Sequence, residues 1–118
     1  MAIESGRKTK SKQLDVVISK PVKKELADLP EKIRDQFLVN ILMLSSGVEP
    51  DLKLSHLSAV GPGVIELKIN GSPAYRLVYT TKFKGELVIL AARAKTAEGT
   101  DRQLLETVTS RLKRQSSA

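Results

Sequence analysis

The feature that most constrains the fold is a change in the spacing of apolar residues near the middle of the chain. From residue 22 to residue 44, apolar side chains recur three or four positions apart, which is the period of a helix with one buried face. From residue 63 they alternate with polar ones, which is the period of a strand. The chain therefore combines helices with a sheet, and all-helical and all-strand folds are excluded.

Two amphipathic helices are expected between residues 21 and 46. Pro30 divides them and suits a first helical turn, and Gly47 and Pro50 close the second helix. Their apolar positions are Val22, Leu26, Leu29, Ile33, Phe37, Ile41 and Leu44, with Leu38 and Leu42 beside them. The two helices should form a hairpin, followed by a surface loop over residues 47–63.

Four strands are expected around this hairpin. Leu14, Val16 and Ile18 alternate in a first strand that Pro21 ends. GVIELKIN at 63–70 has Ile65, Leu67 and Ile69 on one face and a wet face opposite. The turn NGSP leads into YRLVYTT, and ELVILAARA reads as a central strand covered on both faces.

The chain should end in a helix. Residues Thr100 to Gln103 fit a capping box, and Leu104, Leu105, Val108 and Leu112 form an apolar stripe that precedes basic residues. The predicted order is β-α-α-β-β-β-α, an α+β fold in one domain spanning residues 14–114. Residues 1–13 read as a disordered basic arm and 115–118 as a flexible tail.

Charge and composition limit the partners. Twenty Lys and Arg against 13 Asp and Glu give a net charge of +7, which favours a polyanionic partner. With no Cys and one His, neither disulfides nor a metal site is expected, and no cofactor is implied. No apolar run reaches a membrane-spanning length and no secretory signal begins the chain, so a cytoplasmic protein is expected.

Four segments together resemble the RelE/ParE toxin superfamily, nearest to its HigB-like, phage-derived branch. VKKELADLPEKIRDQF resembles the helical hairpin of that family, and GVIELKI resembles its strand with Glu, Leu and a basic residue. YRLVY at 75–79 resembles its Tyr-Arg strand, and ILAARAKT stands where HigB-like members run into Lys-Lys-Thr. The resemblance covers residues 14–113.

This resemblance implies a RelE-like fold with an N-terminal strand, a two-helix hairpin, an antiparallel three-strand meander and a C-terminal helix. It also implies a type II toxin, a ribosome-dependent endoribonuclease that cleaves mRNA and inhibits translation. The implied partners are mRNA on the ribosome and a cognate antitoxin of the helix-turn-helix kind, with DNA contacted only through the toxin–antitoxin complex. A ParE-like gyrase inhibitor and a binding module that has lost catalysis remain alternatives.

Metal-independent RNA cleavage needs a base for the 2′-OH, cations for the phosphate and an acid for the leaving oxygen. Glu66 and Lys68 are two apart and share a strand face, and Arg76 lies on the next strand, where it also has the simpler option of pairing with Glu66. Arg93 and Lys95 follow the central strand at its exit. The predicted catalytic residues are Glu66, Lys68, Arg76, Arg93 and Lys95.

Further basic residues are assigned to RNA binding: Lys53, His56, Lys82 and Lys84. His56 is the only side chain of a type that titrates near neutral pH, although a solvent-facing loop His is the simpler interpretation. Tyr75 and Tyr79 are expected in the core, whereas Phe83 is expected to be exposed enough to stack on a base.

The chain departs from the family pattern at two positions of the last strand. Ala91 stands where many HigB-like members have His, and Thr96 replaces the second Lys. Ordinary Lys and Arg are poor proton donors near neutrality. The departures therefore bear directly on which group would serve as the acid.

Overall fold

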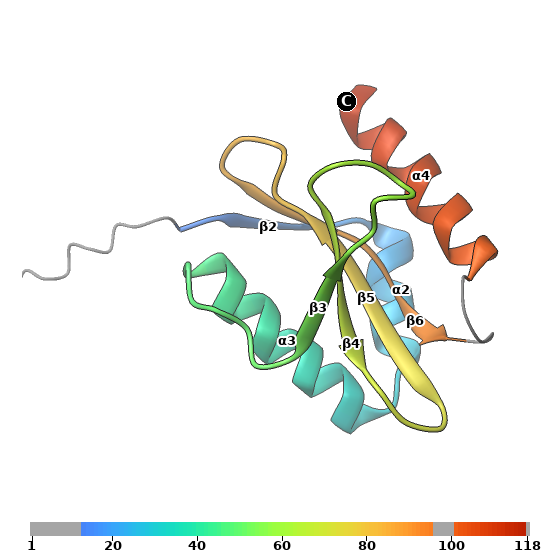
Figure 1. The fold of residues 1–118 in the computed structure, drawn as a ribbon. Coiled ribbons are helices and arrows are strands. Elements are labelled where there is room, and N and C mark those ends of the chain that lie inside the picture. Colours follow the sequence, from blue (N-terminus) through green and yellow to red (C-terminus); the bar gives the residue numbers. More distant parts are fainter. Residues whose placement is uncertain (1–12, 96–100, 118) are drawn as a thin grey trace, which may run out of the picture.

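The computed structural model describes residues 13–95 and 101–117, which form a five-stranded sheet packed against three helices (Figure 1). The helices are α2 (Lys20–Asp28), α3 (Glu31–Ser45) and α4 (Arg102–Ser117). The strands are β2 (Asp15–Ile18), β3 (Lys53–His56), β4 (Val64–Ile69), β5 (Ala74–Thr80) and β6 (Glu86–Lys95). The predicted arm lies almost wholly outside the described residues, and α4 continues three residues beyond the predicted domain end at 114.

The sheet has the order β2-β6-β5-β4-β3 and is mixed. The expected meander is present, because β4, β5 and β6 pair antiparallel in sequence. The first strand, β2, runs parallel to β6, which requires a long connection, and the helical hairpin and strands β3, β4 and β5 all lie between the two in sequence. The α+β class and the element types on either side of the meander are confirmed.

The prediction of a plain surface loop over residues 47–63 is wrong in one part. Residues 53–56 form β3, which pairs antiparallel with β4 at the edge of the sheet. Four residues with one large apolar side chain are too short a run to show a strand period. The approach to β3 is held by buried Asn40, whose Oδ1 accepts hydrogen bonds from the backbone N–H groups of Asp51 at 2.8 Å and Leu52 at 3.1 Å.

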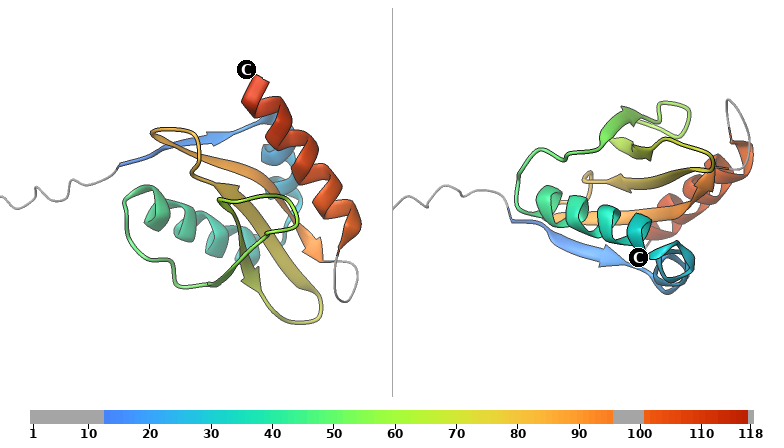
Figure 2. Two further views of the ribbon diagram at one scale, coloured as in Figure 1. Left: turned by 45° about the horizontal axis from the view of Figure 1, so that its top comes forward. Right: turned by 90° about the horizontal axis from the view of Figure 1, so that it is seen from below.

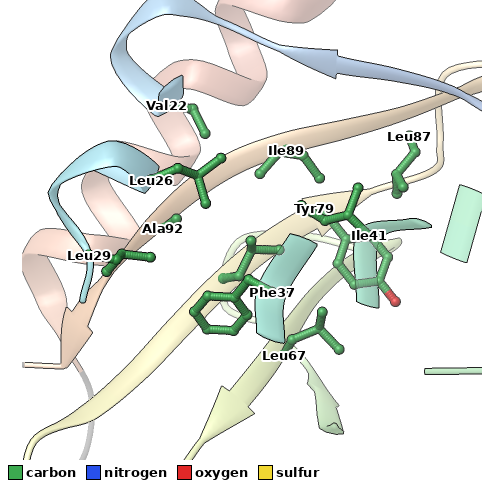
Figure 3. Packing of buried hydrophobic residues seen from close by; sticks show 11 residues of the cluster. Val22, Leu26, Leu29, Phe37, Ile41, Leu67, Tyr79, Leu87, Ile89 and Ala92 are labelled. Atoms are coloured by element: carbon green, nitrogen blue, oxygen red, sulfur yellow. The ribbon is translucent and has the colours of Figure 1, made fainter. Parts of the chain in front are cut away.

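Helices cover both faces of the sheet and give it two apolar cores. The first core lies under α2 and α3 and includes Phe37, Ile41 and Leu67 (Figure 3). The second lies under α4 and includes Val78, Leu104 and Val108. In both views of Figure 2, α3 (green-blue) and α4 (red) lie apart from each other, on different sides of the sheet. β6 contributes to both cores, which confirms that this strand is covered on both faces.

The face of β4 predicted to be wet is covered in part. Val64 is fully buried beneath α4, and Glu66, two residues further on, has a side chain only 14% exposed. The prediction for the opposite face of β4 is confirmed, since Ile65, Leu67 and Ile69 all pack toward the α2 and α3 side. The C-terminal helix thus shields the beginning of this face and leaves polar side chains at its far end.

The start of α4 differs from the predicted capping box. The carboxylate Oδ1 of Asp101 accepts a hydrogen bond from the backbone N–H of Leu104 at 3.1 Å, so Asp101 caps the helix. Thr100, the residue expected in that role, lies outside the described residues. Asp101 therefore sits at the end of α4 that borders the exposed part of the sheet.

Candidate functional site

A pocket of about 330 Å³ opens on the α4 face of the sheet. It lies near the end of β4, the beginning of β5 and the end of β6. Five of the nine residues predicted from sequence line it: His56, Glu66, Lys68, Arg76 and Lys95. The remaining wall comes from Leu57, Ser58 and Ala59 after β3 and from Asp101, Leu104 and Leu105 in the first turn of α4.

Strand register explains why these side chains meet. Lys68 of β4 is directly opposite Arg76 of β5, and directly paired residues in an antiparallel ladder point to the same face. Glu66 precedes Lys68 by two positions and shares that face. Lys95 pairs with Ala74, two residues before Arg76, and therefore joins the group from β6. Three adjacent strands contribute polar side chains to one surface.

Arg76 is held firmly within the pocket wall. Only 8% of the residue is exposed, and its Nη1 donates a hydrogen bond to the carbonyl oxygen of Tyr75 at 2.9 Å. Its Nε lies 3.7 Å from Oε2 of Glu66, so the pairing considered from the sequence is present. The hydroxyl of Ser55 approaches Oε1 of Glu66 at 3.4 Å. These contacts fix a carboxylate and a guanidinium beside each other.

The ammonium groups of the two pocket lysines have no protein partner among the described residues. Within residues 13–95 and 101–117, neither Lys68 nor Lys95 forms a hydrogen bond or an ion pair through its ammonium group. With Arg76 they supply three positive charges against the carboxylates of Glu66 and Asp101. The pocket is therefore net positive and suited to a phosphate group.

His56 occupies the rim of the pocket. It is exposed, ends β3 and is paired with Ile65, whose side chain packs toward the opposite face of the sheet. Because paired residues share a face, the register turns the His56 side chain toward the face opposite Glu66 and Lys68, and His56 reaches the pocket only from the end of the edge strand.

The other predicted residues lie elsewhere. Lys53 is exposed on β3 opposite Lys68 but does not line the pocket. Lys82 and Lys84 lie in the turn after β5, roughly 20 Å along the strand direction from Arg76 at 3.3 Å per residue. Arg93 stands next to Arg76 in register, yet its Nη2 is directed to Oε2 of Glu25 at 2.6 Å.

Glu25 belongs to a charged cluster that the sequence did not indicate. Its carboxylate accepts hydrogen bonds from Arg93, from Arg111 and from the backbone N–H of Ala92. Burial by itself raises the pKa of the Glu25 carboxyl, but these hydrogen bonds outweigh burial and hold the pKa below its ordinary value. A lone Glu on a helix surface carries no sequence signal of such a role. Asp101 was also not predicted as a pocket residue, although its position just before the last helix is a sequence signal for a residue at that helix end.

Three aromatic predictions have clear outcomes. Tyr79 is 3% exposed, and its burial raises the pKa of its phenol, while Tyr75 packs against the same core; both are core residues as expected. Phe83 is partly buried against the core beneath α4, so it is less exposed than expected, and its stacking on a base stays a prediction. Ala91, at the position where His was absent, is fully buried in that core.

The fold and pocket define a class: a small basic α+β protein with a cationic pocket on a helix-covered sheet. Residues 24–113 match the family model described as Phage derived protein Gp49-like (DUF891). The chain therefore belongs to this phage-derived family, which is a HigB-like toxin family of the RelE/ParE superfamily. A search of curated proteins found no match. None of the described helices is long and apolar enough to cross a membrane.

Proposed function

We propose that this protein is the toxin of a type II toxin–antitoxin system and cleaves mRNA on the ribosome. The observation that carries the proposal is that one pocket brings Glu66 together with Lys68, Arg76 and Lys95. Family membership supports the toxin assignment. The net positive pocket supports a phosphodiester as the group that is bound.

Each pocket residue has a role in the proposed reaction. Glu66 accepts the proton of the 2′-OH as its oxygen bonds to the neighbouring phosphorus and the bond from phosphorus to the 5′-oxygen breaks. Lys68, Lys95 and Arg76 hold the phosphate and stabilise the charge that develops on its oxygens. His56 at the rim supplies a proton to the leaving 5′-oxygen. The products would be a 2′,3′-cyclic phosphate and a 5′-hydroxyl end.

The partners are inferred from the family. Ribosome-bound mRNA would be the substrate, and a helix-turn-helix antitoxin would neutralise the protein and link it to DNA. An acidic antitoxin segment would suit a chain with a net charge of +7. These partners imply action in the cytoplasm.

One observation favours a second candidate, a family member that binds its partners without cleaving RNA. Ala91 offers no titratable group, and it is buried under α4 rather than facing the pocket. If His56 at the rim does not reach the leaving oxygen, the pocket has cations and a base but no efficient acid.

Tightly controlled expression in a bacterial host tests the proposal. Protein synthesis is followed by pulse labelling and mRNA ends by primer extension, for the wild type, Arg76→Lys and Lys32→Gln. Lys32 is exposed on α3, which covers the other face of the sheet, and so serves as the matched control. The proposal expects arrest with discrete cuts in the wild type and control, both reduced in Arg76→Lys, because lysine lacks the planar fork of nitrogens.

The other outcomes separate the alternatives. Normal synthesis with intact mRNA from a folded protein would favour the non-cleaving binder. DNA damage without mRNA loss would favour a gyrase inhibitor. Equal toxicity of Arg76→Lys and wild type would remove Arg76 from the proposed machinery.

A further inference from the structure

The edge of β6 beyond its pairing with β2 is completed by side chains. β2 pairs with β6 over Glu86–Ile89, and within residues 13–95 and 101–117 the following backbone groups on that edge have no strand partner. Arg111 of α4 donates a hydrogen bond from Nη1 to the carbonyl oxygen of Leu90 at 2.9 Å. Glu25 of α2 accepts one from the N–H of Ala92 at 3.0 Å. Side chains from two helices, α2 and α4, thus provide hydrogen-bond partners for backbone groups on this edge of β6.

The same two side chains also bind each other. Arg111 donates to both carboxylate oxygens of Glu25, each at 3.0 Å, in a two-point contact. The side chains are 18% and 17% exposed, which limits competition from water. Glu25 therefore joins α2, β6 and α4 at a single carboxylate.

Arg93 is the second basic partner of Glu25, and the direction of its side chain affects the pocket. Register puts Lys68, Arg76 and Arg93 side by side on one face across β4, β5 and β6. An unrestrained Arg93 would extend this row of cations. Its contact with Glu25 at 2.6 Å turns the guanidinium toward α2, and Arg93 does not line the pocket.

We propose that Glu25 is a positioning residue for this pocket. Through Arg111 it seats α4, whose first turn supplies Asp101, Leu104 and Leu105 to the pocket wall. Through Arg93 it limits the cations of the pocket to Lys68, Arg76 and Lys95. The effect on α4 stands on its own geometry, whereas the effect on cleavage rests on the proposed function.

The test compares Glu25→Gln with Asp28→Asn, a matched control on the same helix. Asp28 is exposed, and its side chain forms no hydrogen bond or ion pair within the described residues. Amide hydrogen exchange of the full chain is measured under conditions where each variant is folded. We expect α4 amides in Glu25→Gln to exchange at least about tenfold faster, with β4 amides unchanged, because the helix loses its lateral anchor. Unchanged α4 exchange would overturn the proposal.

Cleavage by the same variants on mRNA-programmed ribosomes separates positioning from stability alone. The single-turnover rate constant at saturation should fall by up to about a hundredfold in Glu25→Gln, with the half-saturating concentration unchanged. A folded Glu25→Gln protein that cleaves at the wild-type rate would show a purely structural role and overturn the positioning claim. Arg93→Gln should cleave within about twofold of wild type, whereas a loss as large as that of Arg76→Lys would place Arg93 in the pocket and overturn it also.

A second variant covers the case in which Glu25→Gln does not fold. Arg111→Lys keeps the charge and loses the two-point contact, so it should loosen α4 in the same direction but to a smaller degree. If the wild type does not cleave RNA at all, the proposed function fails. In that case α4 exchange alone decides whether Glu25 positions the helix.

Discussion

The Nε atom of Arg76 lies 3.7 Å from Oε2 of Glu66, and both side chains are largely buried, with 9% and 14% exposed. A carboxylate is thereby held next to a cation at the wall of a pocket, with little freedom to move away. The pair can stabilise the sheet and also present a base beside a phosphate. Mutation separates these two roles.

Glu66→Gln should abolish most of the cleavage and leave the fold intact. The amide keeps the shape and the hydrogen bond from Ser55 but cannot accept the 2′-OH proton, so the rate should fall by about 10² to 10⁴-fold. Single-turnover cleavage on programmed ribosomes measures this. Ser55→Ala is the control and should retain nearly the full rate. A fully active Glu66→Gln protein would exclude Glu66 as the base.

Binding of single-stranded RNA should weaken with salt in proportion to the number of phosphate contacts. Removing one contact, as in Lys95→Gln, should reduce the slope of log K against log salt by about 0.7. Fluorescence anisotropy with a labelled, uncleavable 2′-O-methyl RNA gives the slope. Lys32→Gln, on α3, should leave it unchanged. An identical slope for Lys95→Gln and wild type would show that Lys95 does not contact phosphate.

Asn40→Ala should destabilise the protein by about 2–3 kcal/mol, because two backbone N–H groups lose their acceptor in a partly buried position. Urea unfolding followed by circular dichroism measures the free energy. Asn40→Asp keeps an acceptor oxygen at the same place and should lose less stability. Equal losses in the two variants would mean that the acceptor is not what holds the start of β3.

Glu25 should make stability depend on pH at the acid end. Its folded pKa is depressed, so its contribution is fully present above its ordinary pKa of 4.5 and is lost as pH falls through the lower folded value. At pH 7, Glu25→Gln should cost about 3 kcal/mol, since Arg93 and Arg111 lose their shared partner. The difference in the free energy of unfolding between Glu25→Gln and the wild type should become smaller as pH falls below 4.5. A difference that stays constant with pH would contradict this account.

Much of the fold was accessible from apolar spacing alone. Phe37 and Ile41 on α3 and Leu67 on β4 are core residues as predicted, because a buried helical stripe and a half-buried strand have different periods. The short strand at residues 53–56 was not accessible. Its stability comes from β4 and from the distant side chain of Asn40, and neither leaves a pattern within four residues.

The candidate site was accessible to the extent that it follows strand register. Glu66, Lys68, Arg76 and Lys95 meet because antiparallel strands present alternate residues to one face. Arg93 follows the same register, but its side chain does not line the pocket. Its guanidinium finds a carboxylate on α2, a contact across 68 residues of chain that no local pattern reports.

The sequence by itself determined the helices and every strand except β3, the basic character of the chain and the face that each residue of those strands occupies. These properties depend on local backbone preference, period and composition. Only the tertiary structure decided that α4 covers part of the polar face, that Asp101 lines the pocket and that Glu25 binds both Arg93 and Arg111. Those outcomes depend on which buried charges and unpaired backbone groups come within hydrogen-bonding distance after packing, and packing brings together residues far apart in the chain.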